Sequence, residues 1–135
     1  MCKINSSLHF SRRVNAAHAR DNETNWTPNT DVYVAEDALI IKVELAGMRR
    51  EDLEITIEGN RLRISGQRPD GCREPHCKFL VMEIHYGSFE SLIELPEGYD
   101  ATQARAAYQN GFLRVDVPLA ARPRRRSLPV ESVRR

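Results

Sequence analysis

The dipeptide Asn110-Gly111 is the feature that most constrains what this chain can fold into. It lies between two short runs of strand-forming residues, AAYQ before it and FLRVDVP after it. Asn and Gly both accept the positive φ angles that a two-residue hairpin turn needs. In the second run apolar and charged residues alternate, so one face should be buried and the other should meet water. The stretch 106–118 therefore predicts a β-hairpin, which ends at Pro118 because proline has no N–H to donate to a sheet.

A second hairpin is predicted around Gly59-Asn60, which is another two-residue turn between alternating runs. Asp100 is expected to cap a single helical turn at 101–103. The segment 78–84 is strand-like but apolar on both faces, which suggests contact on both sides. Because the strands are short and no amphipathic helix of useful length separates them, the sequence predicts an all-β, immunoglobulin-like antiparallel β-sandwich. Beyond the hairpin strand at 112–118, strands are predicted at 31–34, 38–45, 53–58, 61–65 and 89–95.

The distribution of charge divides the chain into a body and a tail. Residues 1–120 carry 14 Lys and Arg against 18 Asp and Glu, a balance of −4, whereas residues 121–135 carry 6 Arg against one Glu, a balance of +5. The first 25 residues are polar and aperiodic, which is typical of a flexible arm; a sticky arm that contacts clients or neighbouring subunits is the alternative. We expect a flexible N-terminal arm at 1–25, one β-sandwich domain at 26–119 and a basic C-terminal tail at 120–135.

Composition also narrows the location of the protein. No run of about 18 apolar residues is present, so no membrane partner is expected. The N-terminal stretch lacks the apolar core of a secretory signal. Three cysteines are too few, and odd in number, for a secreted disulfide framework. These features predict a cytoplasmic protein with reduced thiols.

Four stretches, in order along the chain, resemble the small heat-shock proteins, the α-crystallin domain family. They are LAGMRREDL at 45–53, NRLRISG at 60–66, the stretch from YGSF to LP at 86–96, and the hairpin signature Ala106, Asn110, Gly111 and Leu113. The resemblance covers about residues 26–118 and implies the α-crystallin fold. Ala46 stands where the family usually has Pro. Ser91 stands where members commonly carry an Arg that joins a charge network near the dimer contact.

The resemblance implies an ATP-independent holdase chaperone that binds partly unfolded client proteins and limits their aggregation. It would act as a homodimer or a larger oligomer through exposed apolar surface. The alternative is a co-chaperone-like β-sandwich, a binding module that docks one folded partner. Such modules usually are monomers and lack the tail motif described next.

The resemblance and the apolar pattern together give candidate assembly residues. The dimer loop would use Phe79, Leu80, Val81, Met82 and Ile84, and would pair with an edge strand of a second subunit at Asp31, Val32, Tyr33 and Val34. The tail motif Leu128, Pro129 and Val130 places two apolar side chains on one face of an extended segment. Its acceptor groove, by resemblance, would be formed by Leu53, Ile55, Ile57, Ala104, Ala106 and Tyr108.

No catalytic residues, metal site or cofactor are predicted, because no nucleophile motif, phosphate loop or paired-carboxylate pattern occurs. Cys72 and Cys77, with His76 and His85 nearby, fit no zinc spacing and are interpreted as ordinary loop residues; a redox pair and a metal cluster remain alternatives. The basic run 122–126 could suggest a nucleic-acid patch. No aromatic or folded basic surface supports that partner, so a solubilising tail is expected instead.

Overall fold

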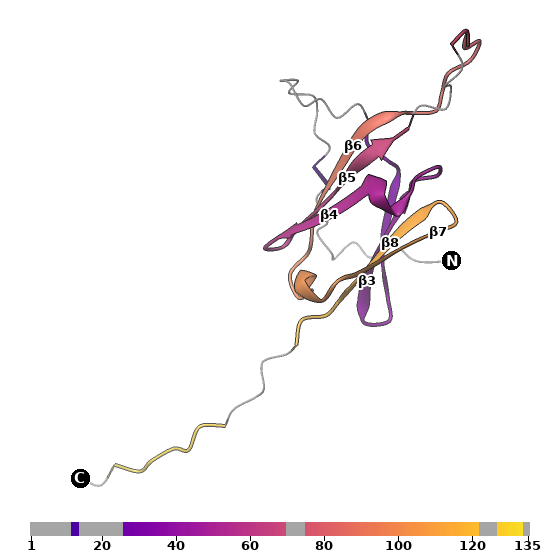
Figure 1. Cartoon of the computed structure of the whole chain (residues 1–135). Helices are drawn as coiled ribbons and strands as arrows, with labels where there is room; N and C mark the ends of the chain where they lie inside the picture. The colour runs from indigo at the N-terminus through magenta and orange to yellow at the C-terminus, as the bar shows by residue number, and fades with distance from the viewer. Residues whose placement is uncertain (1–11, 14–25, 70–74, 122–126, 134–135) are drawn as a thin grey trace.

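The computed structural model describes residues 12–13, 26–69, 75–121 and 127–133, and it contains two antiparallel sheets that pack face to face (Figure 1). The first sheet has the order β1-β6-β5-β4 and the second has the order β2-β3-β8-β7. Two single 3-10 turns, η1 and η2, lie in the connections. The strands of the first sheet are β1 (Arg12–Arg13), β6 (Gly87–Glu94), β5 (Arg61–Arg68) and β4 (Leu53–Glu58). Those of the second sheet are β2 (Thr30–Ala35), β3 (Ala38–Glu44), β8 (Phe112–Pro118) and β7 (Arg105–Gln109), and the turns are η1 (Arg50–Asp52) and η2 (Ala101–Gln103).

Both predicted hairpins are confirmed. Asn110 and Gly111 have φ angles of 53° and 79°, and β7 pairs with β8 directly across that turn. Gly59 has a φ of 59° between the paired strands β4 and β5. The predicted helical cap is also present, since the Asp100 carboxylate accepts a hydrogen bond of 3.0 Å from the backbone N–H of Thr102.

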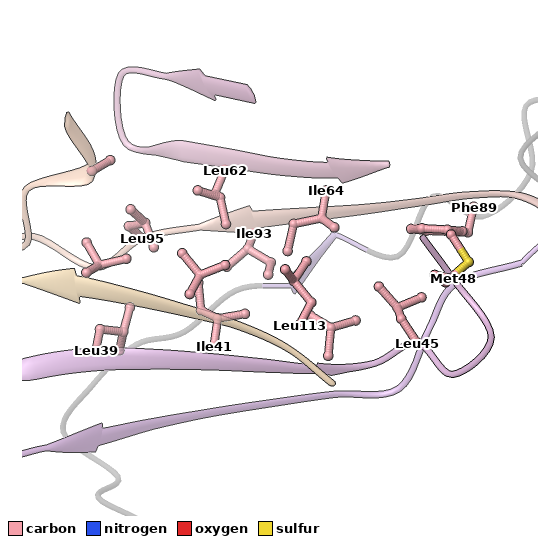
Figure 2. Packing of buried hydrophobic residues seen from close by; sticks show 14 residues of the cluster. Leu39, Ile41, Leu45, Met48, Leu62, Ile64, Phe89, Ile93, Leu95 and Leu113 are labelled. Carbon is pink, nitrogen blue, oxygen red and sulfur yellow. The ribbon is translucent and has the colours of Figure 1, made fainter. Parts of the chain in front are cut away.

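The core lies between the two sheets and is built from the alternating residues that the sequence pattern marks as inward-facing (Figure 2). Cross-strand partners are buried together, as with Leu62 of β5 opposite Ile93 of β6 and Ile41 of β3 opposite Val115 of β8. Burying such side chains contributes about 1.5–3 kcal/mol each, so the sandwich needs no disulfide or metal to close its core. The buried cluster comprises Leu39, Ile41, Val43, Leu45, Met48, Leu62, Ile64, Phe89, Ile93, Leu95, Ala101, Leu113, Val115 and Val117.

The long connection between β5 and β6 differs from the prediction. Both strands are longer than expected, so the loop is confined to residues 69–86. Within its described part, 75–86, no strand forms, although the sequence of 78–84 is strand-like. A strand needs a neighbour to satisfy its backbone groups, and a segment that projects from its own domain has none. Figure 1 shows the described part of this loop, 75–86, extending away from the sandwich.

The N-terminal arm also differs from the prediction. Arg12 and Arg13 form β1, which pairs antiparallel with Ile93 and Leu92 of β6. The sequence predicted no strand at these two residues, while the flexible arm at 1–25 stays a prediction. Their ladder covers part of the β6 edge, which the chain would otherwise leave open at that point.

Gly66 allows η1 to pack directly against β5, and any side chain there would disturb the sandwich. A Cβ atom at Gly66 would lie 2.1 Å from the backbone oxygen of Asp52 and 2.8 Å from Cζ of Phe89. We expect Gly66→Ala to lower the free energy of unfolding by about 1–3 kcal/mol, because a backbone carbonyl and a buried ring must both move. Urea denaturation would measure the change, with Ser65→Ala on the same strand as the control. Equal stability of the two variants would contradict this account of the packing.

Candidate assembly surfaces

The outer strands of the two sheets are arranged so that β4 and β7 lie on the same side of the sandwich. On the opposite side, Trp26 and Thr27, which lead into β2, contact β6. The indole Nε1 of Trp26 donates to the Gly87 carbonyl at 3.1 Å, and Thr27 Oγ1 donates to the Glu90 carbonyl at 3.4 Å. Because the β2 side of one sheet adjoins the β6 side of the other, their remaining edges, β7 and β4, also lie next to each other.

The predicted acceptor residues occupy these two edges. Leu53 and Ile55 of β4, and Ala104 and Tyr108 beside and on β7, are half-buried and pack against the core cluster. Ala106 and Ile57 are exposed, and Ile57 retains 40% of its accessible surface. The structure thus brings these residues into two neighbouring apolar strips with open edges. We call the residues Leu53, Ile55, Ile57, Ala104, Ala106 and Tyr108 the acceptor strips.

Tyr108 ties the two acceptor strips together, a role that the sequence did not reveal. Its hydroxyl donates to the Leu45 carbonyl at 2.6 Å and accepts from the Met48 N–H at 3.3 Å. Leu45 and Met48 belong to the bend between β3 and β4, so β7 is fixed to the segment that leads into β4. The Asn-Gly signature places Tyr108 two residues before its turn, but nothing in the sequence pairs it with residues about 60 positions away.

An exposed ion pair holds the start of β4. Asp52 accepts hydrogen bonds from the Arg49 N–H at 3.1 Å and from the Arg49 guanidinium at 3.3 Å. The Arg49 side-chain hydrogen bond, followed by its backbone hydrogen bond, lowers the pKa of Asp52 below its usual value. A carboxylate with a depressed pKa stabilises the folded state above its unfolded pKa. That contribution is lost as the pH falls through the folded pKa.

The dimer-loop residues are exposed in the single chain. The exposed fraction of the side chains is 89% for Leu80 and 74% for Val81, and Phe79, Met82 and Ile84 are exposed as well. This is the densest group of exposed large apolar residues in the part of the chain that the structure describes. A segment of this kind is a contact surface or an aggregation hazard.

Strand β2, which contains the predicted partner residues, is the outer strand of the second sheet. Val32 packs against the core, Tyr33 is half-buried, and Asp31 and Val34 are exposed. One side of this strand pairs with β3, so its other side presents unpaired backbone groups to a further strand.

The tail motif is also exposed. Leu128 and Val130 retain 73% and 97% of their accessible surface, Pro129 between them is exposed, and the described residues 127–133 form no strand. Figure 1 shows this segment away from the sandwich. Val133 is a third exposed aliphatic residue in the tail, and the sequence motif does not include it.

Two remaining positions can be placed. Ser91 is buried and faces the core, and its hydroxyl has no hydrogen-bond partner among the described residues. Cys77 is disulfide-bonded, contrary to the expectation of reduced thiols, while Cys2 and Cys72 lie outside the described residues. No group of three His, Cys, Asp or Glu that could hold a metal occurs within the described ranges. Among those ranges, no helix is long and apolar enough to cross a membrane.

Comparison with known proteins decides the family. Residues 31–131 match the model of the Hsp20/alpha crystallin family. The chain belongs to this family, the small heat-shock proteins. The resemblance inferred from the four motifs and the predicted β-sandwich fold are thereby confirmed.

Individual proteins are similar to this chain over most of its length. Small heat shock protein C2 of Rickettsia felis is 28% identical over 84% of this chain and 74% of its own length. Spore protein SP21 of Stigmatella aurantiaca is 36% identical over 69% of this chain, and the chain spans only 55% of that relative. The crystal structure of a small heat-shock protein from Xylella fastidiosa has a TM-score of 0.71 with 26% identity, covering 81% of this chain and 100% of that one.

Proposed function

We propose that this small heat-shock protein is an ATP-independent holdase that binds partly unfolded proteins and limits their aggregation. Family membership supports a chaperone role. The observation that carries the mechanism is the set of large apolar side chains that the loop and tail leave exposed beside a well-packed sandwich. Such side chains bind the apolar surface that unfolding clients expose. If these side chains stayed exposed, they would promote aggregation of the chaperone itself. The proposal therefore requires that subunit contacts bury them reversibly.

Dimer formation by strand exchange is the first part of this proposal. The dimer loop has no strand partner within the described chain, and β2 has an open edge. If the loop of each subunit adds to β2 of the other, both sets of backbone groups are satisfied and the exposed side chains are buried. Two-fold symmetry makes the exchange occur twice and closes a dimer.

Docking of the tail on a neighbouring subunit is the second part. An extended Leu-Pro-Val segment presents two aliphatic side chains on one face, and the acceptor strips offer apolar surface along two open edges. Pro129 restricts the backbone to extended conformations and so lowers the entropic cost of docking. This contact would join dimers into larger oligomers. The similar Xylella fastidiosa protein is described as having "a distinct high order structure".

No cofactor, catalytic residue or nucleic-acid partner enters this proposal. The cytoplasmic location, the absence of a membrane partner and the division of the chain at residues 25 and 119 stay predictions. A co-chaperone-like module that docks a folded partner is the competing proposal. It predicts a monomer, whereas the exposed loop and tail favour self-association.

Suppression of client aggregation without nucleotide tests the function directly. A substoichiometric amount of the protein should reduce light scattering from a heated model client, and ATP should make no difference, because apolar capture needs no bond cleavage. Lysozyme at the same mass concentration serves as the inert control. Full scattering at an equimolar ratio, with or without ATP, would overturn the holdase proposal.

Val81→Asp tests the dimer loop. The substitution would place a charge in the buried strand contact, where an unpaired carboxylate is strongly unfavourable. We expect a monomer by analytical ultracentrifugation at micromolar concentration. Val133→Asp, which makes the same chemical change at an exposed residue of the tail, should remain dimeric. A dimeric Val81→Asp would mean that the segment folds back on its own domain.

Replacing Leu128 and Val130 together by Ala tests the tail. Full burial of each side chain contributes about 1.5–3 kcal/mol, so their loss should weaken docking by about a hundredfold or more. Size-exclusion profiles should then shift from larger oligomers toward dimers, while Val133→Ala should leave the profile unchanged. Coincident profiles of the double variant and the parent across concentration would show that the motif does not drive assembly.

A further inference from the structure

The dimer loop leaves the sandwich from a defined root. Its two ends are Arg68, the last residue of β5, and Gly87, the first residue of β6, and these two residues are register partners. The two ends of the loop therefore leave the sheet side by side. Whatever fixes this root sets the direction in which the exposed loop residues are presented.

Arg68 contacts the loop root and the neighbouring bend at the same time. Its Nε donates to the His85 carbonyl at 2.7 Å, and one terminal nitrogen of its guanidinium donates to the Ala46 carbonyl at 3.4 Å. The first bond joins the two ends of the loop, and the second joins the root to the connection between β3 and β4. Ala46 stands where the family usually has Pro, which would restrict the backbone of the bend. The hydrogen bond from Arg68 to the Ala46 carbonyl restrains this bend instead.

The same guanidinium lies over two aromatic rings. Its central carbon is 4.1 Å from the centroid of the Trp26 ring and 5.8 Å from that of Tyr86. Trp26 in turn stacks on His85, with the ring centroids 6.0 Å apart and the planes inclined by 16°. A guanidinium can stack on an aromatic ring and donate hydrogen bonds at the same time, because it is planar and its N–H groups point outward in that plane.

Trp26 anchors this cluster to the sandwich. Its Nε1 donates to the Gly87 carbonyl. Its ring packs against that of the buried Phe89, with the ring centroids 5.1 Å apart. Trp26 is also where residues 1–25 join the domain. The cluster of Trp26, Arg68, His85 and Tyr86, which we call the root clamp, therefore connects that junction to both ends of the dimer loop.

We propose that Arg68 is a positioning residue for subunit exchange: through the root clamp it holds the dimer loop at the angle from which it reaches β2 of the partner. The inference rests on the strand-exchange dimer proposed above. A loop held in its binding direction loses less conformational entropy on association than one that pivots freely at its root. The hydrogen bonds of Arg68 are exposed, and the core cluster does not include it. Its loss should therefore weaken the dimer without destabilising the sandwich.

Arg68→Met removes the hydrogen bonds and the charge while keeping a long, flexible side chain. We expect its dimer dissociation constant, measured by analytical ultracentrifugation, to rise at least tenfold with an unchanged Tm. Arg68→Lys keeps a cation over Trp26 but cannot reproduce the planar fork, so its dissociation constant should be intermediate. The matched control is Arg61→Met, which removes a half-buried arginine paired with Glu94 from the same strand and should match the parent.

Fluorescence of Trp26 reports the clamp independently of the dimer, because it is the only tryptophan in the chain. In the monomeric Val81→Asp background, adding Arg68→Met should shift the emission to longer wavelength and increase quenching by acrylamide, whereas adding Arg61→Met should do neither.

The outcomes separate this inference from the proposed dimer. If Val81→Asp dissociates the dimer but Arg68→Met matches Arg61→Met in dissociation constant, the dimer proposal stands and the positioning role is wrong. If Arg68→Met lowers the Tm enough to account for its weakened dimer, Arg68 only stabilises the fold. That result would also overturn the positioning role. A dimeric Val81→Asp would overturn both proposals.

Discussion

An antiparallel sandwich satisfies the backbone hydrogen bonds of its inner strands and leaves those of its outer strands open. Among the described strands, the inner strands β3, β8, β5 and β6 have a neighbour on both sides, β6 only in part on the β1 side, whereas β4, β7 and β2 are each paired on one side only. Because an open, apolar edge attracts further strands, a protein must cover it, charge it or use it. The residues beside these edges are largely apolar, so cover by another segment is the solution that the structure supports.

The segments available for that purpose lie outside the sandwich and have the matching chemistry. The dimer loop and the tail motif both consist of apolar residues in irregular, exposed chain. In the proposed assembly, these exposed segments of one subunit would cover the open edges of β2, β4 and β7 in other subunits. Reversible pairing of this kind would expose apolar surface when subunits separate, which links assembly to client binding in the proposed function.

Sequence patterns predict the local features of this fold and miss the contacts between distant residues. The Asn110-Gly111 turn and the alternating residues around it depend on neighbours along the chain, and both were predictable. The bond from Tyr108 to Leu45 and the stacking of Arg68 on Trp26 join residues tens of positions apart, and no periodicity encodes them. Ile40 is a further example. The alternation places it on the face opposite the core residues Leu39 and Ile41, yet only 2% of its surface is exposed. Its register partners are Tyr33 and Asp116. The candidate site was predictable only as sets of residues, because the loop and tail are exposed in the single chain and the partners proposed for them belong to a second one.

The bend at residues 45–48 connects the two kinds of assembly surface. The Leu45 carbonyl accepts from Tyr108 at the acceptor strips, and the Leu45 N–H donates to the Gly111 carbonyl at the hairpin turn. One residue later, the Ala46 carbonyl accepts from Arg68 at the root of the dimer loop. A displacement of this bend would alter the hydrogen bonds at both surfaces, because the two accepting carbonyls belong to consecutive residues. The proposed tail docking at the acceptor strips and the proposed loop exchange would therefore both depend on this bend, although the acceptor strips and β2 lie on opposite sides of the sandwich.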